Sequence, residues 1–355
     1  MGSKLTPLGS GAHFGVIGFL AANCQTARLT PAVLLLAAAC SGNGAVAPAA
    51  SPLTIVAPRL DAPLFEAFPP ASALPEDPVK AAVFERINRD RLAEGLPPVL
   101  WDEAASRVAD AFCRNQIREN TTGHFLTDGV APYARTALAG VFGMQYENSV
   151  TWKTTGSSFQ DAVKDLALTG HEEMLAEKPP YDGHRKTILD PSATHVGVGY
   201  DIRGGEFRMA QEFLTRHLAW MRIERVNPRS ATVIVSGKPL EGRKLFFVTV
   251  GWEPPPSALT REAASRRMSY SYPAPVEAFV KEGIVDMRIV GAVTSDRIRF
   301  KRDGSFELRF TPGRPGLWTL VFQTTPLRQQ QSSSGGVAVL WVDRPPPAPA
   351  EAGAP

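Results

Sequence analysis

Cysteine is scarce in this sequence, which has only three in 355 residues: Cys24, Cys40 and Cys113. The first two lie in the N-terminal region, so Cys113 is the single thiol of the remaining chain. One thiol cannot form an intrachain disulfide, which excludes a small disulfide-stapled scaffold and leaves stability to core packing. Cys113 falls on the apolar stripe of a predicted helix, and we interpret it as a buried hydrophobe rather than a nucleophile.

A large net charge is also missing, since 38 Lys and Arg face 35 Asp and Glu. A net charge of +3 argues against a uniformly basic protein that binds nucleic acid. The charge is unevenly distributed. Residues 76–220 hold 16 basic and 21 acidic residues, whereas residues 221–355 hold 19 and 12. This asymmetry indicates two modules with different surfaces.

No apolar run near the N-terminus is long enough to cross a membrane. The run Pro31–Ala39 would span about 13 Å as a helix, against about 30 Å for a bilayer core. It ends in small residues and Cys40, followed by Ser41-Gly42-Asn43-Gly44, and this pattern resembles a bacterial lipoprotein signal. We therefore predict a signal peptide over 1–40 and lipidation of Cys40. The protein would be exported and anchored to a bacterial membrane on its periplasmic or cell-surface side. An ordinary cleaved secretory signal or a short membrane anchor is the alternative.

Composition divides the rest of the chain. Residues 41–75 are rich in Ala, Pro and Ser and predict a tether, and residues 345–355 predict a disordered tail. Residues 76–220 mix helical and strand patterns. Asp77 and Asp102 are predicted to cap two helices, and a third is expected from Phe159 to about Glu177, with strands at Val196–Tyr200 and Phe207–Phe213.

Residues 221–344 contain only short strand patterns. Ile298 and Phe300 alternate with basic residues, as do Phe306 and Leu308 with polar ones, and an Asp-Gly turn at 303–304 predicts a hairpin between them. The remaining strand candidates are Thr232–Val235, Leu245–Val250, Leu317–Phe322 and Val337–Val342. Six short strands suit a β-sandwich of immunoglobulin-like type. The predicted fold class is therefore α+β, with a mixed module followed by an all-β module.

Histidine is concentrated in the mixed module, which holds five of the six. His124, His184 and His195 lie in distinctive Gly-His or Thr-His contexts, and Glu147 precedes Asn148. Imidazoles with carboxylates are typical of divalent-cation sites and of acid/base pairs. There is no His-Glu-x-x-His motif, so spacing alone does not choose between a site and packed histidines. We interpret His195 as a strand-edge residue and His217 as a surface residue.

The order of several motifs resembles the CAP superfamily, also called SCP, of cysteine-rich secretory, allergen and pathogenesis-related proteins. The resemblance covers about residues 76–220. The motifs that carry it are the run 87–102, Gly123-His124-Phe125, Glu147-Asn148, Gly183-His184-Arg185-Lys186-Thr187-Ile188-Leu189-Asp190-Pro191 and Thr194-His195-Val196-Gly197-Val198-Gly199.

The resemblance implies an α-β-α sandwich with a cleft lined by two histidines and two glutamates. His124, Glu147 and His184 match three of these positions. The second glutamate precedes His184 on a helix in the family, so Glu173 or Glu172 is expected to take its place. The family's usual Trp context is missing there, which leaves the choice between the two open, and Tyr146 replaces a glycine that is common before Glu-Asn.

Such a cleft suggests three functions. His124 and His184, with Glu147 and Glu173, could hold Zn²⁺ or Mg²⁺, and the resemblance favours binding of a lipid or small apolar ligand over any one reaction. A hydrolase acting on peptide, ester or cell-wall substrates through His124, Glu147 and His184 is the first alternative. An adhesive envelope protein with a vestigial cleft is the second. Basic residues of the 296–310 hairpin could dock to an anionic envelope polymer.

Overall fold

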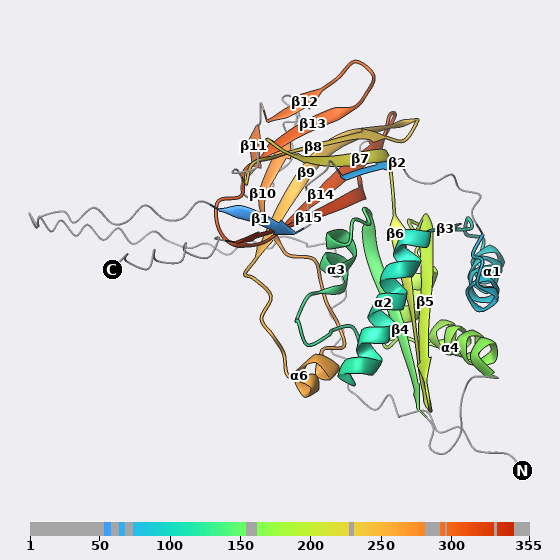
Figure 1. The fold of residues 1–355 in the computed structure, drawn as a ribbon. Helices are drawn as coiled ribbons and strands as arrows, with labels where there is room; N and C mark the ends of the chain where they lie inside the picture. The colour runs from blue at the N-terminus through green and yellow to red at the C-terminus, as the bar shows by residue number, and fades with distance from the viewer. Residues whose placement is uncertain are drawn as a thin grey trace, which may run out of the picture.

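The computed structural model describes residues 53–57, 64–67, 74–153, 162–226, 231–280, 292–294, 297–329 and 332–343. The predicted signal peptide with Cys40, most of the predicted tether and the predicted tail lie outside these residues. The described residues form a mixed α/β module and a module of two β-sheets (Figure 1). None of the described helices is long and apolar enough to span a membrane.

The helices of the first module begin at the predicted caps. The Asp77 carboxylate accepts hydrogen bonds from two backbone N–H groups at the start of α1 (Pro78–Ala93), and Asp102 caps α2 (Glu103–Glu119) in the same way. Both positions confirm the prediction. The other helices are α3 (Pro132–Leu138), α4 (Val163–Ala176) and α5 (Gly183–Ile188). The third predicted helix corresponds to α4, and its predicted start at Phe159 lies outside the described residues.

A four-stranded sheet separates these helices into two layers. Its order is β3 (Leu100–Trp101), β5 (His195–Arg203), β6 (Glu206–Thr215) and β4 (Met144–Lys153). α1 and α4 share one apolar core with the sheet, whereas α2 packs on its other face. A Cβ atom at Gly197 or Gly199 would overlap the backbone of α2, so these glycines allow the helix to lie close against β5. The expected three-layer arrangement is present, and β4 is an edge strand.

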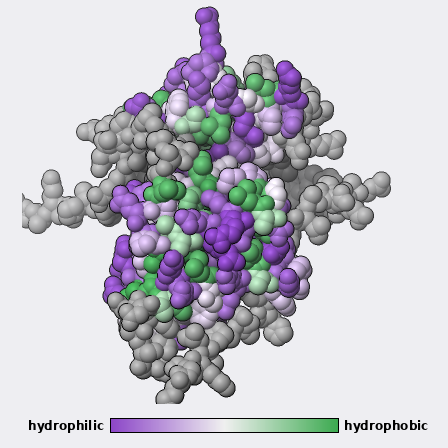
Figure 2. Space-filling model, turned by 90° about the vertical axis from the view of Figure 1, so that its right-hand side faces the viewer, coloured by the Kyte–Doolittle hydropathy of each residue, from purple (hydrophilic) through white to green (hydrophobic). Residues whose placement is uncertain are grey.

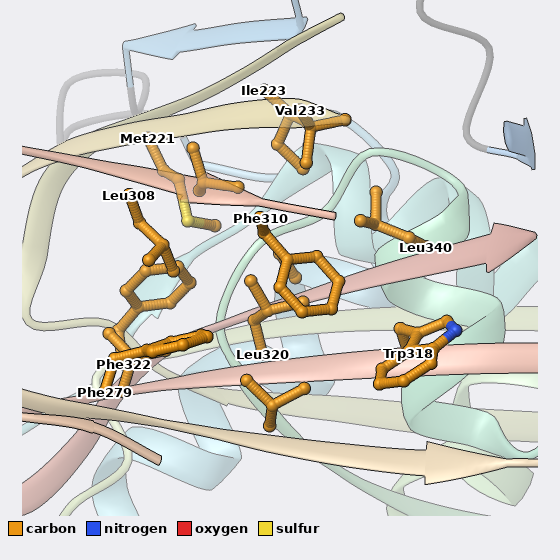
Figure 3. Packing of buried hydrophobic residues seen from close by; sticks show 14 of the residues in the cluster. Met221, Ile223, Val233, Phe279, Leu308, Phe310, Trp318, Leu320, Phe322 and Leu340 are labelled. Carbon is orange, nitrogen blue, oxygen red and sulfur yellow. The ribbon is translucent and has the colours of Figure 1, made fainter. Parts of the chain in front are cut away.

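The second module consists of two sheets that pack face to face. One sheet has the order β1 (Thr54–Ala57), β15 (Ser333–Asp343), β14 (Gly316–Pro326), β9 (Arg243–Glu253), β10 (Pro275–Val280) and β11 (Ala292–Thr294). The other has the order β12 (Ile298–Phe300), β13 (Phe306–Phe310), β8 (Val233–Pro239), β7 (Leu218–Arg225) and β2 (Leu64–Ala67). Side chains from both sheets, including Phe279, Phe310, Trp318, Phe322 and Leu340, fill the space between them (Figure 3). The immunoglobulin-like type stays a prediction.

Two boundaries differ from the sequence predictions. The predicted tether contributes β1, which pairs with β15, and β2, which pairs with β7, so it is not an unstructured linker throughout. Pairing supplies the backbone hydrogen bonds that local sequence could not reveal. The sandwich also begins earlier than residue 221, because all of β7 belongs to it.

The two modules share a buried apolar contact. α3 lies on the outer face of β14 and β15. The buried members of this contact are Val130, Tyr133, Ala134, Ala137, Leu317, Val337 and Val339. A buried ion pair between Arg216 and Asp102 lies near it, with Arg216 Nε donating to the Phe142 carbonyl at 2.6 Å. Away from this contact, the face seen in Figure 2 intermixes hydrophilic and hydrophobic side chains among the coloured residues.

Candidate functional site

His124 and Glu147 form a buried pair. His124 follows Gly123, whose φ of 77° bends the connection between α2 and α3, and Glu147 lies on the edge strand β4. His124 Nδ1 is 2.9 Å from Glu147 Oε1. Arg135 of α3 donates to the other oxygen of Glu147, and its guanidinium lies 3.9 Å from the ring centre of Phe112. Both oxygens of Glu147 are therefore engaged.

His184 forms a second, more exposed pair at the start of α5. Its Nδ1 lies 2.6 Å from Glu177 Oε1, and its backbone N–H donates to Glu177 Oε2 at 3.0 Å. The ring centres of His184 and His124 are 6.4 Å apart. The structure thus brings together three of the four predicted cleft residues, namely His124, Glu147 and His184.

The fourth predicted residue lies elsewhere. Glu172 forms an ion pair with Arg86 of α1 at 2.5 Å, and the Glu173 side chain is exposed. The carboxylate beside His184 is Glu177, which caps the C-terminal end of α4. Its position just after the last helical turn and seven residues before His184 is the signal that could have identified it. Glu177 therefore replaces Glu172 and Glu173 as the acidic partner.

A second buried carboxyl was missed by the sequence analysis. Glu212 on β6 lies directly opposite Glu147 in the strand register and is fully buried. Gln145 donates a hydrogen bond to it. Burial, with the neighbouring Glu147, raises the pKa of Glu212 well above its usual range and so favours the protonated form of this carboxyl. The signal in the sequence is a charged residue in the middle of a strand that is buried on both faces.

The electrostatics of the site leave His124 uncharged. Burial lowers its pKa to about 3, with smaller contributions in the same direction from His184 and Arg135. Burial also raises the pKa of Glu147, which Arg135 opposes. A neutral His124 that donates its Nδ1 proton to Glu147 keeps Nε2 as an acceptor. The arrangement can accept a hydrogen bond from a bound molecule.

The remaining histidines are structural. His171 is fully buried between Asp90, at 3.0 Å, and Gln211, at 3.1 Å. His195 begins β5, and burial lowers its pKa to about 4. His217 is half-buried and hydrogen-bonded to Thr324 and Ser333, so its assignment as a surface residue was wrong. The reason is the junction between the modules, which covers it.

Cys113 is confirmed as a buried thiol. It lies in the apolar contact between α2 and β6, and its Sγ is 3.6 Å from the Gly199 carbonyl oxygen. Burial raises its pKa well above the usual range, which opposes formation of the reactive thiolate.

The donor set does not fit the predicted metal site. Within the described part of the chain, no three His, Cys, Asp or Glu side chains are grouped so that they could hold a metal ion. The Glu147 oxygens already contact His124 and Arg135, and the Arg135 cation would oppose a divalent ion beside them. Burial favours the protonated form of Glu212, and carboxyls must lose their proton to bind metal. We therefore derive no step through Zn²⁺ or Mg²⁺.

The first module is similar to known proteins. Residues 84–213 match the family model of CAP, the Cysteine-rich secretory protein family. The chain is 30% identical over 118 residues to the uncharacterized protein YkwD of Bacillus subtilis (strain 168). This match covers 33% of the chain and 40% of the relative's length, so most of each protein lies outside it.

Two solved structures are similar over a comparable share of the chain. An extracellular protein containing an SCP domain from Bacillus anthracis str. Ames has 22% identity and a TM-score of 0.30, covering 41% of this chain and 45% of that one. An outer surface protein from Borrelia burgdorferi has 15% identity and a TM-score of 0.31, covering 40% of this chain and 96% of that one. The family match and the Bacillus subtilis relative thus place the similarity to CAP proteins within the first module.

Proposed function

We propose that this chain is an exported envelope protein whose CAP domain binds a small ligand between His124 and His184. The observation that supports it is the pair of histidine–glutamate contacts with ring centres 6.4 Å apart. Each glutamate orients its imidazole and engages Nδ1, which keeps the second ring nitrogen for other contacts. The His184 side chain is one-quarter exposed, so a ligand can reach the site from solvent.

The chemistry favours a ligand with a polar end and an apolar part. Two oriented imidazoles suit a hydroxyl or another hydrogen-bonding group. The ring of Tyr270, whose centre lies 5.4 Å from that of His124, offers an apolar surface next to them. A lipid with a polar head is a molecule of this class.

Ligand binding can be tested with two defined probes, a fluorescent fatty acid and a soluble peptidoglycan fragment. We expect the purified full-length chain to bind one of them saturably, and the His124→Ala/His184→Ala variant to lose that binding. His217→Ala is a matched control, since His217 lies at the junction with the sandwich. Binding that survives in the double variant would contradict the proposal and favour a vestigial cleft.

A hydrolase is the second candidate, and the geometry of His124 and Glu147 supports it. An imidazole oriented by Glu147, with Arg135 holding the other oxygen of that carboxylate, has the arrangement of an acid/base pair. Turnover of peptide, ester or peptidoglycan substrates that His124→Ala and His184→Ala both abolish would support it. The same turnover in both variants would exclude the cleft as its source.

Membrane anchoring through Cys40 is a separate part of the proposal. It is supported by the short apolar run ending in small residues before that cysteine. Cys40→Ser is expected to move the protein from the membrane fraction to the soluble fraction after cell lysis. Continued membrane association of this variant would contradict a lipid anchor.

The β-sandwich is proposed to dock to an anionic envelope surface, made of polymer or lipid headgroups, through the exposed Arg299 and Arg309 of its 296–310 hairpin. Two neighbouring cations are already paired, Lys301 with Glu307 at 2.6 Å and Arg297 with Glu277 at 3.6 Å. We expect co-sedimentation with vesicles rich in phosphatidylglycerol to weaken in Arg299→Glu/Arg309→Glu. Equal sedimentation of both proteins would argue against this surface.

A further inference from the structure

A long segment of the sandwich crosses to the CAP domain. Residues 254–274 connect β9 to β10 and include the short helix α6 (Arg261–Arg266); we call this segment the strap. Figure 1 shows it leaving the sandwich, passing α3 and placing α6 beside the end of α2. A direct β9–β10 hairpin would need only a few residues. The extra length therefore serves a contact with the first module.

The strap is attached to the connection that carries His124. Leu259 N–H donates to the Thr127 carbonyl at 2.8 Å, and Thr122 N–H donates to the Ser265 hydroxyl at 3.1 Å. Met268 lies against Gly123, where an added Cβ would be 2.9 Å from its sulfur. These contacts flank His124 on both sides along the chain.

Two tyrosines of the strap cover the edge strand of the CAP sheet. The Tyr270 hydroxyl accepts from Glu147 N–H at 2.7 Å, and its ring centre is 5.4 Å from that of His124. The Tyr272 hydroxyl accepts from Gln145 N–H at 2.8 Å and donates to the carbonyl of the same residue at 3.1 Å. Tyr133 of α3 stacks on Tyr272 with ring centres 4.4 Å apart. The strap therefore meets both His124 and the backbone of its partner Glu147.

We propose that the strap closes one side of the cleft and that Tyr270 determines which ligands reach His124. The exposures of the two imidazoles agree with this: the His124 side chain, next to Tyr270, is 10% exposed, whereas the His184 side chain is 25% exposed. The binding site is thus built from both modules. The role in ligand choice rests on the proposed function, but closure of the cleft is testable without any ligand.

A simpler role for the tyrosines would be to protect an exposed sheet edge from pairing with other chains. That role requires the hydroxyl contacts to β4 but predicts no effect on access to His124. The two roles can be tested separately, because protection of the sheet edge affects exchange of the backbone amides of β4, whereas closure of the cleft affects the accessibility of the His124 imidazole.

The first experiment measures amide hydrogen exchange by NMR in two matched variants of the full-length chain. Tyr270→Phe is expected to speed exchange at Glu147 but not at Gln145, and Tyr272→Phe is expected to do the reverse. The expected change is about fivefold, the factor that corresponds to the net contribution of one hydrogen bond. Unchanged exchange at Glu147 in Tyr270→Phe would overturn the contact on which the proposal stands.

The second experiment measures access to His124 with diethyl pyrocarbonate, which modifies unprotonated imidazoles, followed by peptide mass spectrometry. We expect Tyr270→Ala to increase modification of His124 by about tenfold, as loss of a local barrier of this kind allows. His184 should react equally in both proteins, and the fully buried His171 should stay unmodified. Equal His124 reactivity in the wild type and a folded Tyr270→Ala would overturn the proposal.

A third variant covers the case in which Tyr270→Ala does not fold. Met268 is 39% exposed and contacts Gly123 without touching β4 in the contacts described above, so Met268→Ala should fold. It is expected to increase His124 modification as well, and no increase would count against closure by the strap. Failure of the fatty-acid and peptidoglycan probes to bind would instead contradict the proposed function while leaving these results unchanged.

Discussion

His124 is held uncharged by its surroundings rather than by its own chemistry. Burial lowers its pKa from 6.5 to about 3. The unfolded chain, with an ordinary pKa, binds a proton on this residue below pH 6.5, whereas the folded chain does not until about pH 3. The contribution of His124 to the free energy of unfolding therefore decreases as the pH falls from 6.5 to about 3. The pair with Glu147 persists over the whole range in which the cleft would operate.

The ring signals of His124 report this state directly. We expect its Hε1 resonance in an NMR titration to stay constant between pH 8 and pH 5, because the residue does not titrate until about pH 3. The signal is assigned by its disappearance in His124→Gln. A titration midpoint near 6.5 would show that the imidazole is open to solvent and not buried against Glu147.

Glu212 gives a prediction of opposite sign. Its pKa is raised by burial, so the folded chain retains a proton that the unfolded chain releases above its ordinary pKa of 4.5. Stability supplied by this group is complete below that value and is lost as pH rises. Glu212→Gln keeps a neutral donor and acceptor in the same place. We expect its free energy of unfolding, measured with urea, to match the wild type near pH 4 and exceed it at pH 7; equal values at both pH values would contradict the protonated state.

Three cleft residues could be predicted from the sequence and two could not. His124, Glu147 and His184 lie in short motifs whose order is characteristic, so local sequence was sufficient. Glu177 was missed because the turn after α4 places its carboxylate at His184, whereas helical periodicity pointed to residues 172 and 173. Glu212 meets Glu147 only through the register of β4 and β6, which no local pattern specifies.

At the scale of elements, helix starts that are set by nearby residues were predictable, whereas strands that form by pairing with distant parts of the chain were not. Asp77 and Asp102 accept from N–H groups two or three residues away, so the starts of α1 and α2 were predictable. β1 and β2 are four residues each and lie in a segment rich in Ala and Pro. They form because β15 and β7 offer open edges, and those edges are distant in sequence.

β1 provides a test of this pairing. Ile55 is 3% exposed in the core of the sandwich, whereas Val56 next to it is 46% exposed. Ile55→Ala is expected to reduce the free energy of unfolding by about 2–4 kcal/mol, the usual cost of such a truncation in a core. Val56→Ala should change it by less than about 0.5 kcal/mol, as surface substitutions do. Equal effects in urea denaturation would place the segment outside the sandwich.

At the scale of the whole molecule, α3 joins the first module to the sandwich. β15 alternates between two cores: Ala338 and Leu340 face the interior of the sandwich, and Val337 and Val339 face α3. Both sets are fully buried. One strand therefore belongs to two cores at once, and the same contact positions the strap over β4. Loss of this contact is therefore expected to have two effects at once: the modules separate, and the cleft opens.

Val339→Asp tests that coupling. An unpaired carboxylate between α3 and β15 has a large desolvation cost, while the inward residues of the strand are left intact. We expect the wild type to unfold in one calorimetric transition and the variant to unfold in two, with faster modification of His124 by diethyl pyrocarbonate. Val276→Asp is the matched control, because Val276 on β10 is 46% exposed and lies outside the interface. A single transition in Val339→Asp with unchanged His124 reactivity would show that the cleft does not depend on the junction.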